Sequence, residues 1–588
     1  MCAINGVYSF HYAAPSIDRD EVLRTRDAML SRGPDAAGIW TSPDRRLALA
    51  HRRLKIIDLT EAGSQPMASQ CGRFVLSFNG EIYNYQALRD DLRSRGEVFR
   101  SASDTEVLLR LLMRDGAQAL NRARGMFALA LWDNRRQRLM LARDPFGIKP
   151  LYVANDGWQL RFASQVKALV AGGRISSQPE PAGQAGFLLT GSVPEPFTMY
   201  QQIRALPAGH YQLFDTRGPQ TPAPFVSARP AKHTRLGIGK SEDAPVSGAL
   251  SLKQSLEDSV RAHMVADVPV GLFLSSGIDS AVLAAIGSKI NPSIRCVTLG
   301  FEEYKGSASD EVVLATNIAQ ALGVKHQVRY YTQQEFEQDF STVLEAMDQP
   351  SIDGFNTWLV AGACRKMGLK TALSGLGADE LFKGYPSFID VPTWRSRMAI
   401  GRWLPGLGSL VRMGLQPLCE ILGISPKAAG MLEYGSTMGG AYLLKRGLFM
   451  PWELAPLMGK HAAKQGLQRL GLLKMLNGTV AGAHSDVEKV SRLEQTFYMK
   501  NQLLRDADWA GMSHSLEIRV PFVDVQLQAA IGGAQFCKTD LLATAAELLP
   551  EELAGRPKTG FSTPLDHWRG YPGAGWARHW AKELACEF

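Results

Sequence analysis

The sequence predicts a protein of two domains, an antiparallel layered α+β domain followed by an α/β domain built on a parallel sheet. The chain has 588 residues, which is too many for a single hydrophobic core. Up to about residue 200, turn residues separate short apolar or alternating runs, a pattern typical of antiparallel sheets. After about residue 249, strand and helix patterns alternate, which indicates a parallel sheet with right-handed crossovers.

The first domain is expected to cover residues 2–214. Its predicted strands are FVLSFNG, the two runs within FALALWDNRRQRLMLARD, and WQLRFAS, with Asp133 and Asn134 closing a hairpin. One amphipathic helix, SASDTEVLLRLLMRDG, interrupts the strands. Ser103 and Glu106 form a capping-box pattern at its start, and Gly116 ends it.

Residues 215–248 are rich in Pro, Gly, Ser and charge and lack periodicity, so we expect a linker there. The second domain, residues 249–588, is predicted to contain the strands VPVGLFL, IRCVTLGF and KTALSG. The helices SAVLAAIGSKI and DEVVLATNIAQALG lie between them. Residues from about 390 to 500 carry Leu, Met and Gly at helical spacing, which predicts a mostly helical extension.

The composition restricts the class of protein. Lys and Arg outnumber Asp and Glu by 65 to 57, giving a formal charge of +8, but the basic residues are scattered. We therefore expect no nucleic-acid partner. The seven cysteines are dispersed and never paired as CxxC, which argues against a zinc site and for a reducing compartment. The sequence shows no basic leader and no long apolar stretch, so we expect a cytoplasmic protein without a membrane partner.

Two glycine-containing loops carry the strongest signal for a nucleotide site. LSSGIDS, residues 274–280, follows one predicted strand, and SGLGADE, residues 374–380, follows another. Backbone N–H groups and serine hydroxyls in such loops bind phosphate, while Asp279 and Asp379 would repel it unless Mg²⁺ bridges them. Either loop alone could be an ordinary helix start. At one edge of a parallel sheet, the two together make a site for a nucleotide and its metal.

The position of Cys2 at the start of the chain also needs an explanation. Removal of Met1 is expected because the side chain that follows it is small. Cys2 would then carry a thiol and a free α-amine on the same residue.

Ten short stretches occur in an order that resembles the glutamine-dependent asparagine synthetase family. They are MCAING, RGPDAAG, AHRRLKIIDL, NGEIYN, SDTEVLL, RDPFGIKPLY, LSSGIDS, SGLGADELFKGY, LEIRVPFVD and RPKTGF. Several are weak alone, but the ordered set is highly specific and extends from residue 2 to about 565. The resemblance implies a four-layer α+β sandwich of the N-terminal-nucleophile (Ntn) hydrolase type. A parallel-sheet ATP-pyrophosphatase domain, of the adenine nucleotide α-hydrolase-like kind and with a helical extension, would follow it.

In the first domain, the resemblance implies that Cys2 attacks the side-chain amide of glutamine with its own α-amine as the base. Reference pKa values of ~8 for the amine and ~8.5 for the thiol allow this proton transfer at little cost. Asn79 and Gly80 would form the oxyanion hole, and Arg53 and Asp104 would hold the α-carboxylate and α-amine of glutamine. The same pocket would be lined by Leu54, Lys55, Ile56, Ile57 and Glu81.

Each of these residues also has an ordinary alternative. Cys2 could be an incidental buried thiol or a palmitoylation site. Asn79 and Gly80 could form a hairpin turn, Asp104 could serve only to cap its helix, and Arg53 could be a solvated surface charge.

In the second domain, the resemblance implies an ATP site and a metal site. ATP would be bound by Leu274, Ser275, Ser276, Gly277, Asp279, Ser280, Leu299 after the second strand, Ser374, Gly375 and Lys558. Asp279 and Asp379 would hold Mg²⁺ against the leaving pyrophosphate, and Lys558 would neutralise its charge. Adenylation of a carboxylate brings anions together, so cations must be in place beforehand.

The sequence departs from the family at two positions in these loops. The usual SGG is SSG here, which adds the hydroxyl of Ser276, and the usual SGEG is SGLG, with Leu376 in place of the glutamate. Leucine cannot accept a proton, and a positioned base is worth about 10²- to 10⁴-fold in rate. Three nearby acids could substitute for it: Asp348, Asp353 and Glu380.

The resulting hypothesis is a glutamine-hydrolysing, ATP-dependent amidotransferase of the asparagine synthetase type, with ATP and Mg²⁺ as cofactors. Aspartate is the default acceptor, giving asparagine, AMP and pyrophosphate. Leu376 motivates the alternative that another carboxylate is amidated, such as a uronic acid or a biosynthetic intermediate. A nucleotide-binding scaffold without turnover is a further alternative. The expected partners are these small molecules, and a homodimer is a candidate assembly.

Overall fold

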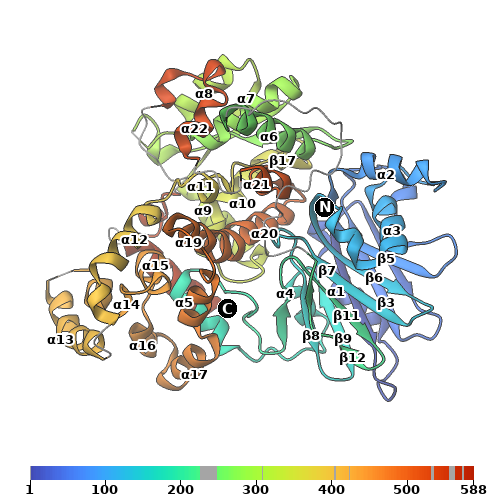
Figure 1. The fold of residues 1–588 in the computed structure, drawn as a ribbon, viewed down its shortest axis with the longest axis horizontal. Coiled ribbons are helices and arrows are strands. Elements are labelled where there is room, and N and C mark those ends of the chain that lie inside the picture. Colours follow the sequence, from blue (N-terminus) through green and yellow to red (C-terminus); the bar gives the residue numbers. More distant parts are fainter. Residues whose placement is uncertain are drawn as a thin grey trace.

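The computed structural model describes residues 2–225, 248–307, 309–402, 406–422, 424–531, 536–554, 563–571 and 575–588. The chain forms two parts that lie side by side (Figure 1). One is a β-rich part built from most of residues 2–225, and the other is a larger part in which helices surround a third sheet. Residues 226–247, within the predicted linker, and Lys558 lie outside the described residues.

The β-rich part contains two antiparallel sheets. Their strand orders are β10-β8-β9-β1-β3-β2 and β12-β11-β7-β6-β5-β4, and β13 also pairs with β11. The first sheet consists of β1 (Cys2–Ser9), β2 (Ala36–Thr41), β3 (Leu47–Arg53), β8 (Tyr152–Asn155), β9 (Gln159–Ala163) and β10 (Ile203–Ala205). The second consists of β4 (Met67–Ala68), β5 (Phe74–Ile82), β6 (Gly125–Asp133), β7 (Arg138–Arg143), β11 (His210–Asp215), β12 (Gly218–Pro219) and β13 (Ala223–Pro224).

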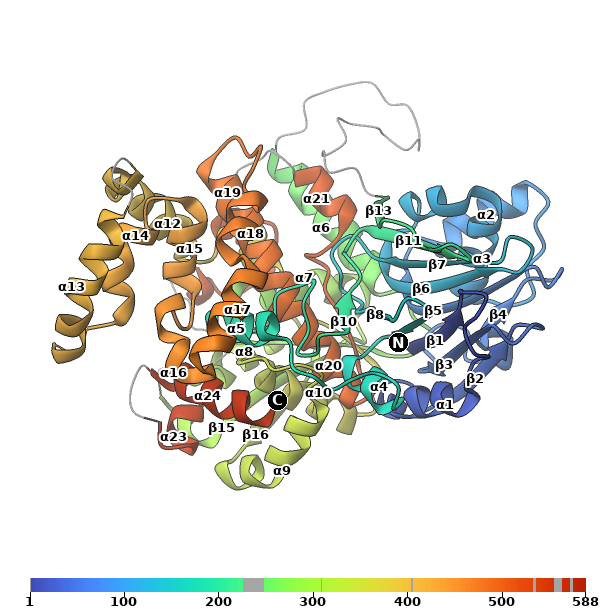
Figure 2. The ribbon, with the colours of Figure 1, turned by 90° about the horizontal axis from the view of Figure 1, so that it is seen from below.

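The two sheets pack face to face, and helices cover their outer faces. Helices α1 (Arg19–Asp27) and α4 (Val166–Ala171) lie on the first sheet, and α2 (Tyr85–Ser94) and α3 (Asp104–Asp115) lie on the side of the second (Figure 2). Between the sheets, the rings of Tyr8 and Trp132 meet edge to face with centroids 5.3 Å apart. The layers therefore run helix, sheet, sheet, helix.

Strand β1 is buried on both faces, which explains its sequence CAINGVYS. Ile4 and Tyr8 belong to the core between the sheets, whereas Ala3 and Val7 belong to clusters that include residues of α4 and α1. Alternate residues of a strand point to opposite faces, and here both faces are covered. The sequence of β1 therefore lacks the apolar–polar alternation of a half-buried strand, and the sequence analysis did not predict β1.

The third sheet has five parallel strands in the order β16-β15-β14-β17-β18, as the alternating strand and helix pattern predicted. The strands are β14 (Val270–Phe273), β15 (Arg295–Phe301), β16 (Lys325–Tyr331), β17 (Thr371–Leu373) and β18 (Glu517–Arg519). One face is covered by α6 (Gly248–His263), α7 (Ile278–Ile290) and α8 (Val312–Ala321). The other is covered by α9 (Gln333–Ala346), α10 (Gly354–Lys366) and α20 (Arg505–Ser513).

The helical extension predicted from about residue 390 to 500 is confirmed. It comprises α12 (Ser387–Arg397), α13 (Leu407–Ile421), α14 (Met431–Tyr434), α15 (Met438–Arg446), α16 (Ala455–Met458), α17 (Lys460–Leu470), α18 (Leu472–Thr479), α19 (Asp486–Leu493) and a π-helix, Glu494–Leu504. The other helices of this part are α11 (Ala378–Leu381), α21 (Val525–Ile531), α22 (Lys538–Ala543), α23 (Leu565–Trp568) and α24 (Trp576–Glu587). Helix α5 (Pro181–Thr190) packs against α17, so this segment of the first half lies among the helices of the second (Figure 2).

Several local predictions need correction. Ser103 caps α3 as expected, but the Glu106 carboxylate accepts hydrogen bonds from the backbone N–H groups of Arg100 and Ser101 instead of completing a capping box. The segment after Asp215 forms β12 and β13 on the second sheet before the chain leaves the described residues. Strands β16 and β18 were not predicted, because the first is a half-exposed edge strand and the second has three residues.

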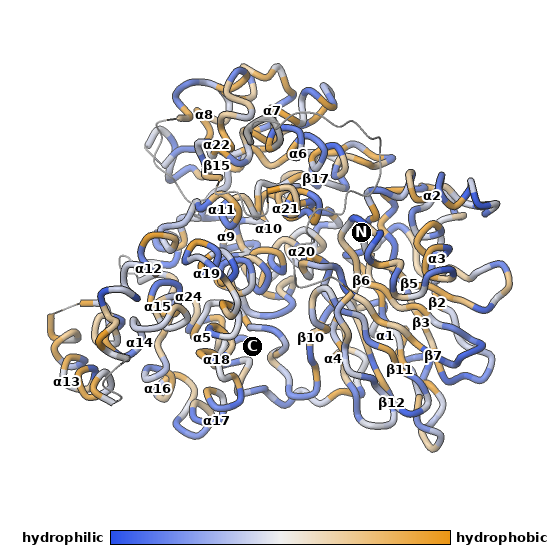
Figure 3. Tube along the Cα trace, in the orientation of Figure 1, coloured by the Kyte–Doolittle hydropathy of each residue, from blue (hydrophilic) through white to orange (hydrophobic). Residues whose placement is uncertain are grey.

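Hydrophobic segments run through the sheets and the central helices, and many hydrophilic segments lie in loops at the edge of the molecule (Figure 3). Among the described residues, no helix is both long enough and apolar enough to cross a membrane.

A buried ion cluster joins the two parts of the chain. Arg32 donates to both carboxylate oxygens of Asp508, over 2.6 and 3.0 Å, and Lys149 Nζ lies 3.4 Å from Asp508 Oδ1. All three side chains are at most 3% exposed. Burial alone would raise the pKa of Asp508, but Arg32 and Lys149 hold it below its ordinary value of 3.8. Two cations of the first part therefore depend on one carboxylate of the second.

The substitution Asp508→Asn should destabilise the protein by about 3–5 kcal/mol, because it leaves two buried cations without their anion. Since the folded-state pKa of Asp508 is lowered, its contribution is present above pH 3.8 and lost as the pH falls through the lowered value. Urea denaturation at neutral pH measures the loss. The matched control is Asp90→Asn, which removes an exposed pair with Arg93 at 3.7 Å and should change stability by less than about 0.5 kcal/mol. Equal effects of the two variants would contradict the prediction.

Candidate functional site

The first candidate site forms around Cys2, where strands from both sheets of the β-rich part meet. Cys2 is the first residue of β1, and its backbone pairs with that of Arg53 on β3. The backbone nitrogen of Cys2 donates a hydrogen bond of 3.0 Å to Asn79 Oδ1 on β5, in the facing sheet. The structure therefore brings together three residues that are separated by up to 77 positions in the sequence.

The neighbours of Cys2 offer hydrogen-bond donors of the kind that stabilise a developing oxyanion. The Asn79 side chain is fully buried, and its Nδ2 has no hydrogen-bond partner among the described residues. A side chain at Gly80 would collide with the Met126 carbonyl at 2.1 Å, which explains the glycine beside it. A buried amide without a hydrogen-bond acceptor is costly unless a ligand supplies one, so the geometry is compatible with the predicted role of Asn79 in an oxyanion hole.

Cys2 is 7% exposed, and burial raises the pKa of its thiol. The charge of the amino terminus, the Leu54 backbone N–H and the charge of Arg53 act in the opposite direction without cancelling this effect. The resting group is therefore a neutral thiol, which needs a base when it reacts.

Arg53 and Asp104 are buried and connected through the loop that follows β3. The Arg53 guanidinium donates to the carbonyl of Thr60 over 2.8 Å and to that of Asp58, and the Asp58 carboxylate accepts from the N–H of Ala102 over 2.9 Å. Asp104 starts α3 and accepts from the N–H of Ile82 over 3.0 Å. Burial raises the pKa of Asp104 to about 6. Arg53 is therefore not a solvated surface charge, and Asp104 does more than cap its helix.

The remaining residues of the predicted glutamine pocket fall into two groups. Leu54, Ile56 and Ile57 are buried, whereas the Lys55 side chain pairs with the exposed Glu61 over 2.7 Å. The Lys55 backbone N–H donates to Asp35 Oδ2 over 2.8 Å. The loop also contacts the second part of the chain: Ile56 O accepts from the N–H of Asp267, over 2.9 Å.

Glu81 lies in a buried charge cluster that the sequence analysis did not identify. Arg519 Nη2 is 3.7 Å from Glu81 Oε2, and Arg519 Nε donates to Glu517 Oε1 over 2.6 Å. Burial raises the pKa of Glu81, while the positive charge of the amino terminus and that of Arg519 hold the pKa of Glu517 below its ordinary value despite burial. The signal in the sequence was the pair of opposite charges within the apolar stretch LEIRVPF.

The second candidate site lies at one edge of the parallel sheet, where both glycine loops emerge as predicted. Strands β14 and β17 are parallel neighbours, with Leu272 opposite Leu373. A side chain at Gly375 would come within 3.1 Å of Asp279 Cβ and 3.2 Å of the Ser280 nitrogen, so the two loops are in contact. The second loop is anchored by the Ser374 N–H, which donates to Arg519 O over 2.8 Å.

The serines of the first loop are arranged around its turn into α7. Ser280 Oγ accepts from the Ser275 N–H over 3.0 Å and lies 2.9 Å from Ser275 Oγ. Gly277 caps the helix, and the Ser276 hydroxyl is buried without a partner among the described residues. A free hydroxyl beside a helix N-terminus is suited to an anionic oxygen.

Two further ATP-site predictions have different outcomes. Leu299 does not follow the second strand but lies inside β15, opposite Arg329, and is 3% exposed, because β15 ends at Phe301, as the predicted strand IRCVTLGF also does. Its buried apolar side chain can only contribute to the wall of the predicted ATP site. Lys558, the predicted pyrophosphate ligand, falls outside the described residues.

Asp279 and Asp379 share a cation that the sequence analysis missed. Lys538, the first residue of α22, pairs with Asp379 over 2.8 Å and also contacts Asp279. Although burial lowers the pKa of Lys538, the two carboxylates raise it above its ordinary value. The carboxylates thus meet as predicted and require positive charge between them. Nothing in FCKTD marked this lysine in advance.

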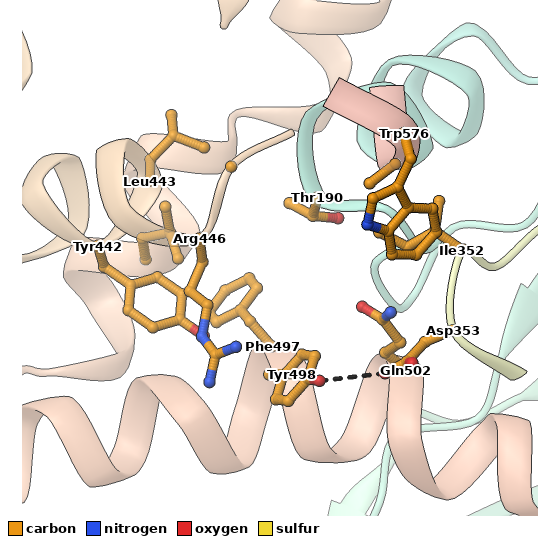
Figure 4. Close-up of a pocket in the computed structure, with 13 residues that line it drawn as sticks. Thr190, Ile352, Asp353, Tyr442, Leu443, Arg446, Phe497, Tyr498, Gln502 and Trp576 are labelled. Atoms are coloured by element: carbon orange, nitrogen blue, oxygen red, sulfur yellow. Dashed lines mark hydrogen bonds between the residues drawn. The ribbon is translucent and has the colours of Figure 1, made fainter. Parts of the chain in front are cut away.

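The three acids considered as substitutes for the missing glutamate differ in their surroundings. The Asp348 carboxylate accepts from the N–H groups of Val166 and Lys167, over 3.1 and 3.0 Å, and is a structural link between the two parts. Glu380 is 1% exposed, and burial together with Asp379 raises its pKa to about 8. Asp353 accepts from the Tyr498 hydroxyl over 3.1 Å beside a cavity (Figure 4). Glu380 and Asp353 remain candidates.

Comparisons with known proteins agree with this division of the chain. Residues 1–225 match the glutamine amidotransferase domain family, and residues 251–586 match the asparagine synthase family. The chain is 31% identical over 611 residues to glutamine-hydrolysing asparagine synthetase 1 of Bacillus subtilis, covering 99% of this chain and 90% of that protein.

Two further relatives match over a smaller part of their length. Glutamine-hydrolysing asparagine synthetase B of Escherichia coli is 32% identical, over 67% of this chain and 66% of that protein. Amidase chry2 of Gibberella zeae is 30% identical, over 66% of this chain and 60% of that protein. With an amidotransferase domain around Cys2 and a synthase domain around the glycine loops, the chain belongs to the glutamine-hydrolysing asparagine synthetase family of ATP-using ligases.

Proposed function

We propose that this protein takes ammonia from glutamine at Cys2 and uses it to amidate a carboxylate that has been activated by ATP at the two glycine loops. The observation that carries the proposal is the presence of two half-sites in one chain. In the first, the Cys2 backbone nitrogen is hydrogen-bonded to Asn79, and in the second, the loops of Asp279 and Asp379 are in contact. An isolated glutaminase would not need the second half-site. An ATP-dependent synthetase using free ammonium would not need the first.

In the glutaminase half, of the Ntn-hydrolase type, the Cys2 thiol attacks the side-chain amide carbon of glutamine. Its proton passes to the α-amine that Cys2 carries once Met1 has been removed. Asn79 Nδ2 donates to the oxyanion, and Arg53 and Asp104 hold the α-carboxylate and α-ammonium of the substrate. Collapse of the adduct releases ammonia and leaves a thioester, which water hydrolyses to glutamate. The raised pKa of Cys2 makes the proton transfer to a base a necessary part of this step.

In the synthetase half, of the ATP-pyrophosphatase type, the carboxylate attacks the α-phosphorus of ATP, and pyrophosphate leaves. The Ser276 hydroxyl, which has no partner among the described residues, would donate to a phosphate oxygen, and Ser275 and Ser280, hydrogen-bonded to each other, would shape the loop around it. Asp279 and Asp379 fit Mg²⁺. Both carboxylates contact the same cation, Lys538, and one or two carboxylates are the usual protein ligands of Mg²⁺ bound to a nucleotide. The ion would supply charge neutralisation at the pyrophosphate.

The acceptor is the finer part of the proposal. The names of the relatives from Bacillus subtilis and Escherichia coli indicate aspartate, which gives asparagine, AMP and pyrophosphate. A different carboxylate is the second candidate, and Leu376 favours it, because a leucine stands where the resemblance leads us to expect a glutamate. The decisive experiment supplies ATP, Mg²⁺ and glutamine with aspartate or other carboxylates and follows AMP and the amide product.

The variant Cys2→Ala should lose glutamine-dependent activity by roughly 10³-fold or more, because no other group can form the thioester. Activity with a high concentration of ammonium should persist, since the synthetase half is separate. AMP release with each nitrogen source measures both. The control Cys71→Ala removes an exposed thiol and should behave as the wild type does. Equal loss with both nitrogen sources would contradict the division of labour.

Use of glutamine should weaken as the pH falls below about 6. The folded-state pKa of Asp104 is raised to about 6, so its carboxylate takes up a proton through that pH and no longer attracts the substrate ammonium. We expect kcat/KM for glutamine to fall about tenfold per pH unit below that value. The variant Asp104→Asn should have a low kcat/KM without this step. A wild-type profile that is flat between about pH 5 and 7 would rule out the assignment.

The variant Lys538→Ala should raise the KM for ATP by about 10- to 100-fold, because a charge-assisted contact next to the phosphates is lost. Glutaminase activity should not change. The control Lys289→Ala removes a surface lysine that pairs with Glu547 over 3.0 Å, and its KM for ATP should stay at the wild-type value. If Lys538→Ala leaves the KM for ATP unchanged, Lys538 serves only the structure of the apo site.

A further inference from the structure

The helical extension carries an apolar face that no other part of the described chain covers. Among the described residues, 17 large apolar side chains are exposed, and nine of them lie between residues 400 and 424. Helix α13 spans most of this stretch and lies at the outer edge of the molecule, away from the β-rich part, in both views (Figure 1, Figure 2). These nine residues form the α13 surface: Ile400, Leu407, Leu410, Met413, Leu415, Leu418, Ile421, Leu422 and Ile424.

The opposite face of α13 fixes the helix to its neighbours. A side chain at Gly408 would come within 2.6 Å of Glu433 Cα in α14, so the two helices are in close contact there. Arg412 Nε donates to Glu433 Oε2 over 2.6 Å, and Cys419 is 8% exposed. The helix is therefore held by this face, while the α13 surface is left to solvent.

The exposed residues follow the helical repeat. Leu407 and Leu410 are three residues apart, as are Leu418 and Ile421, and the two pairs are eight residues apart. Because 3.6 residues make one turn, all four lie in one stripe along the helix. Ile421 is 79% exposed. Monomeric proteins rarely leave a long apolar face in water, so the stripe indicates an interaction site.

The charge around the α13 surface favours an anionic partner. Between Asp390 and Glu433 the sequence has five basic residues and one acidic residue, namely Arg395, Arg397, Arg402, Arg412, Lys427 and Glu420. Of the basic residues, Arg395 pairs with Asp486 over 2.9 Å. With Arg412 also paired, a surplus of two positive charges remains. One of them is Arg397, the last residue of α12, which is exposed and has no ion pair among the described side chains.

The same charge argues against a second copy of the chain as the occupant. Two copies would meet with the same positive surplus on both sides, and each chain carries a formal charge of +8 as a whole. Like charges across an interface are unfavourable. A bilayer with anionic lipids attracts basic residues near its surface and also accepts apolar side chains at the boundary between head groups and acyl chains.

We propose that the α13 surface docks the protein on a membrane that contains anionic lipids. Leu407, Leu410, Leu418 and Ile421 would enter the boundary between head groups and acyl chains, and Arg397 would meet lipid phosphates. Such binding needs no membrane-spanning segment, which was the feature that the sequence analysis looked for when it expected no membrane partner. The inference goes beyond the proposed function and does not depend on it.

The test measures how the full-length protein partitions onto lipid vesicles by co-sedimentation. One set of vesicles is phosphatidylcholine alone, and the other is an equal mixture with phosphatidylglycerol. We expect the partition coefficient to be at least about tenfold higher with the anionic vesicles and to fall as salt is added, because salt screens exposed charges. Absence of binding to the anionic vesicles at low salt would overturn the inference.

Variants separate the apolar contribution from the charge. The double variant Leu418→Ser with Ile421→Ser should lower the partition coefficient on anionic vesicles by at least about tenfold, because two apolar side chains no longer leave water. Arg397→Ala should lower it by about fivefold, since one cation near the lipid phosphates is lost. The control Val313→Ser changes an isolated, 61% exposed residue of α8 and should bind as the wild type does.

Two further measurements make the outcome decisive. The glutaminase rate and the thermal midpoint of every variant should match those of the wild type, because the altered side chains are exposed. A midpoint that falls in step with vesicle binding would mean that the α13 surface is only structural. Light scattering should give the same mass for the wild type and the double variant. If the wild type is an oligomer that the double variant dissociates, a second copy covers this surface and the inference is wrong. Equal vesicle binding by the wild type and the double variant would also overturn it.

Discussion

The geometry of the two half-sites depends on the burial of one guanidinium, that of Arg519. Its side chain has no solvent exposure, and burying it unpaired would be prohibitive. The charge is satisfied by Glu517 and by the carbonyls of His263 and Val265, which accept over 2.8 and 2.7 Å. Its own carbonyl accepts from Ser374 in the second glycine loop. The position of that loop and the position of Glu81 beside Asn79 are thus set by the same residue.

This arrangement places the two candidate sites in one electrostatic environment. Glu81 and Asp104 of the proposed glutamine pocket both have raised pKa values through burial, with Glu517 as a contributing charge. On the other side, β18 carries Glu517 and Arg519 beside β17, which leads directly into the loop of Asp379. A change of charge at Glu81 or Asp104 therefore acts on Glu517 and Arg519, the pair next to the second glycine loop. The Arg32, Lys149 and Asp508 cluster holds the same two parts together, so neither half-site can move independently at low cost.

Short-range features were predictable because they depend on neighbours in the sequence. The two glycine loops were expected at one edge of a sheet, since the strands of a parallel sheet present their carboxyl ends on the same side, and β14 and β17 are neighbours in that sheet. The expected proximity of the Asp279 and Asp379 carboxylates followed from that geometry. Predictions failed where a residue had two possible partners within reach. Glu106 bonds the N–H groups of Arg100 and Ser101 instead of the helix cap, because the preceding loop brings them closer.

By itself, the sequence determined the order of the two domains, the parallel sheet, the loops and the candidate nucleophile, because each is encoded in a local pattern of apolar spacing or in a motif. Only the tertiary structure decided which charges meet. Lys538 lies 259 residues from Asp279, and Arg519 more than 400 from Glu81, so no local pattern could pair them. It also decided that Arg446 pairs with the fully buried Glu494. Charges pair across such distances because burial makes an unmatched ion costly, and folding alone determines which ions are buried together.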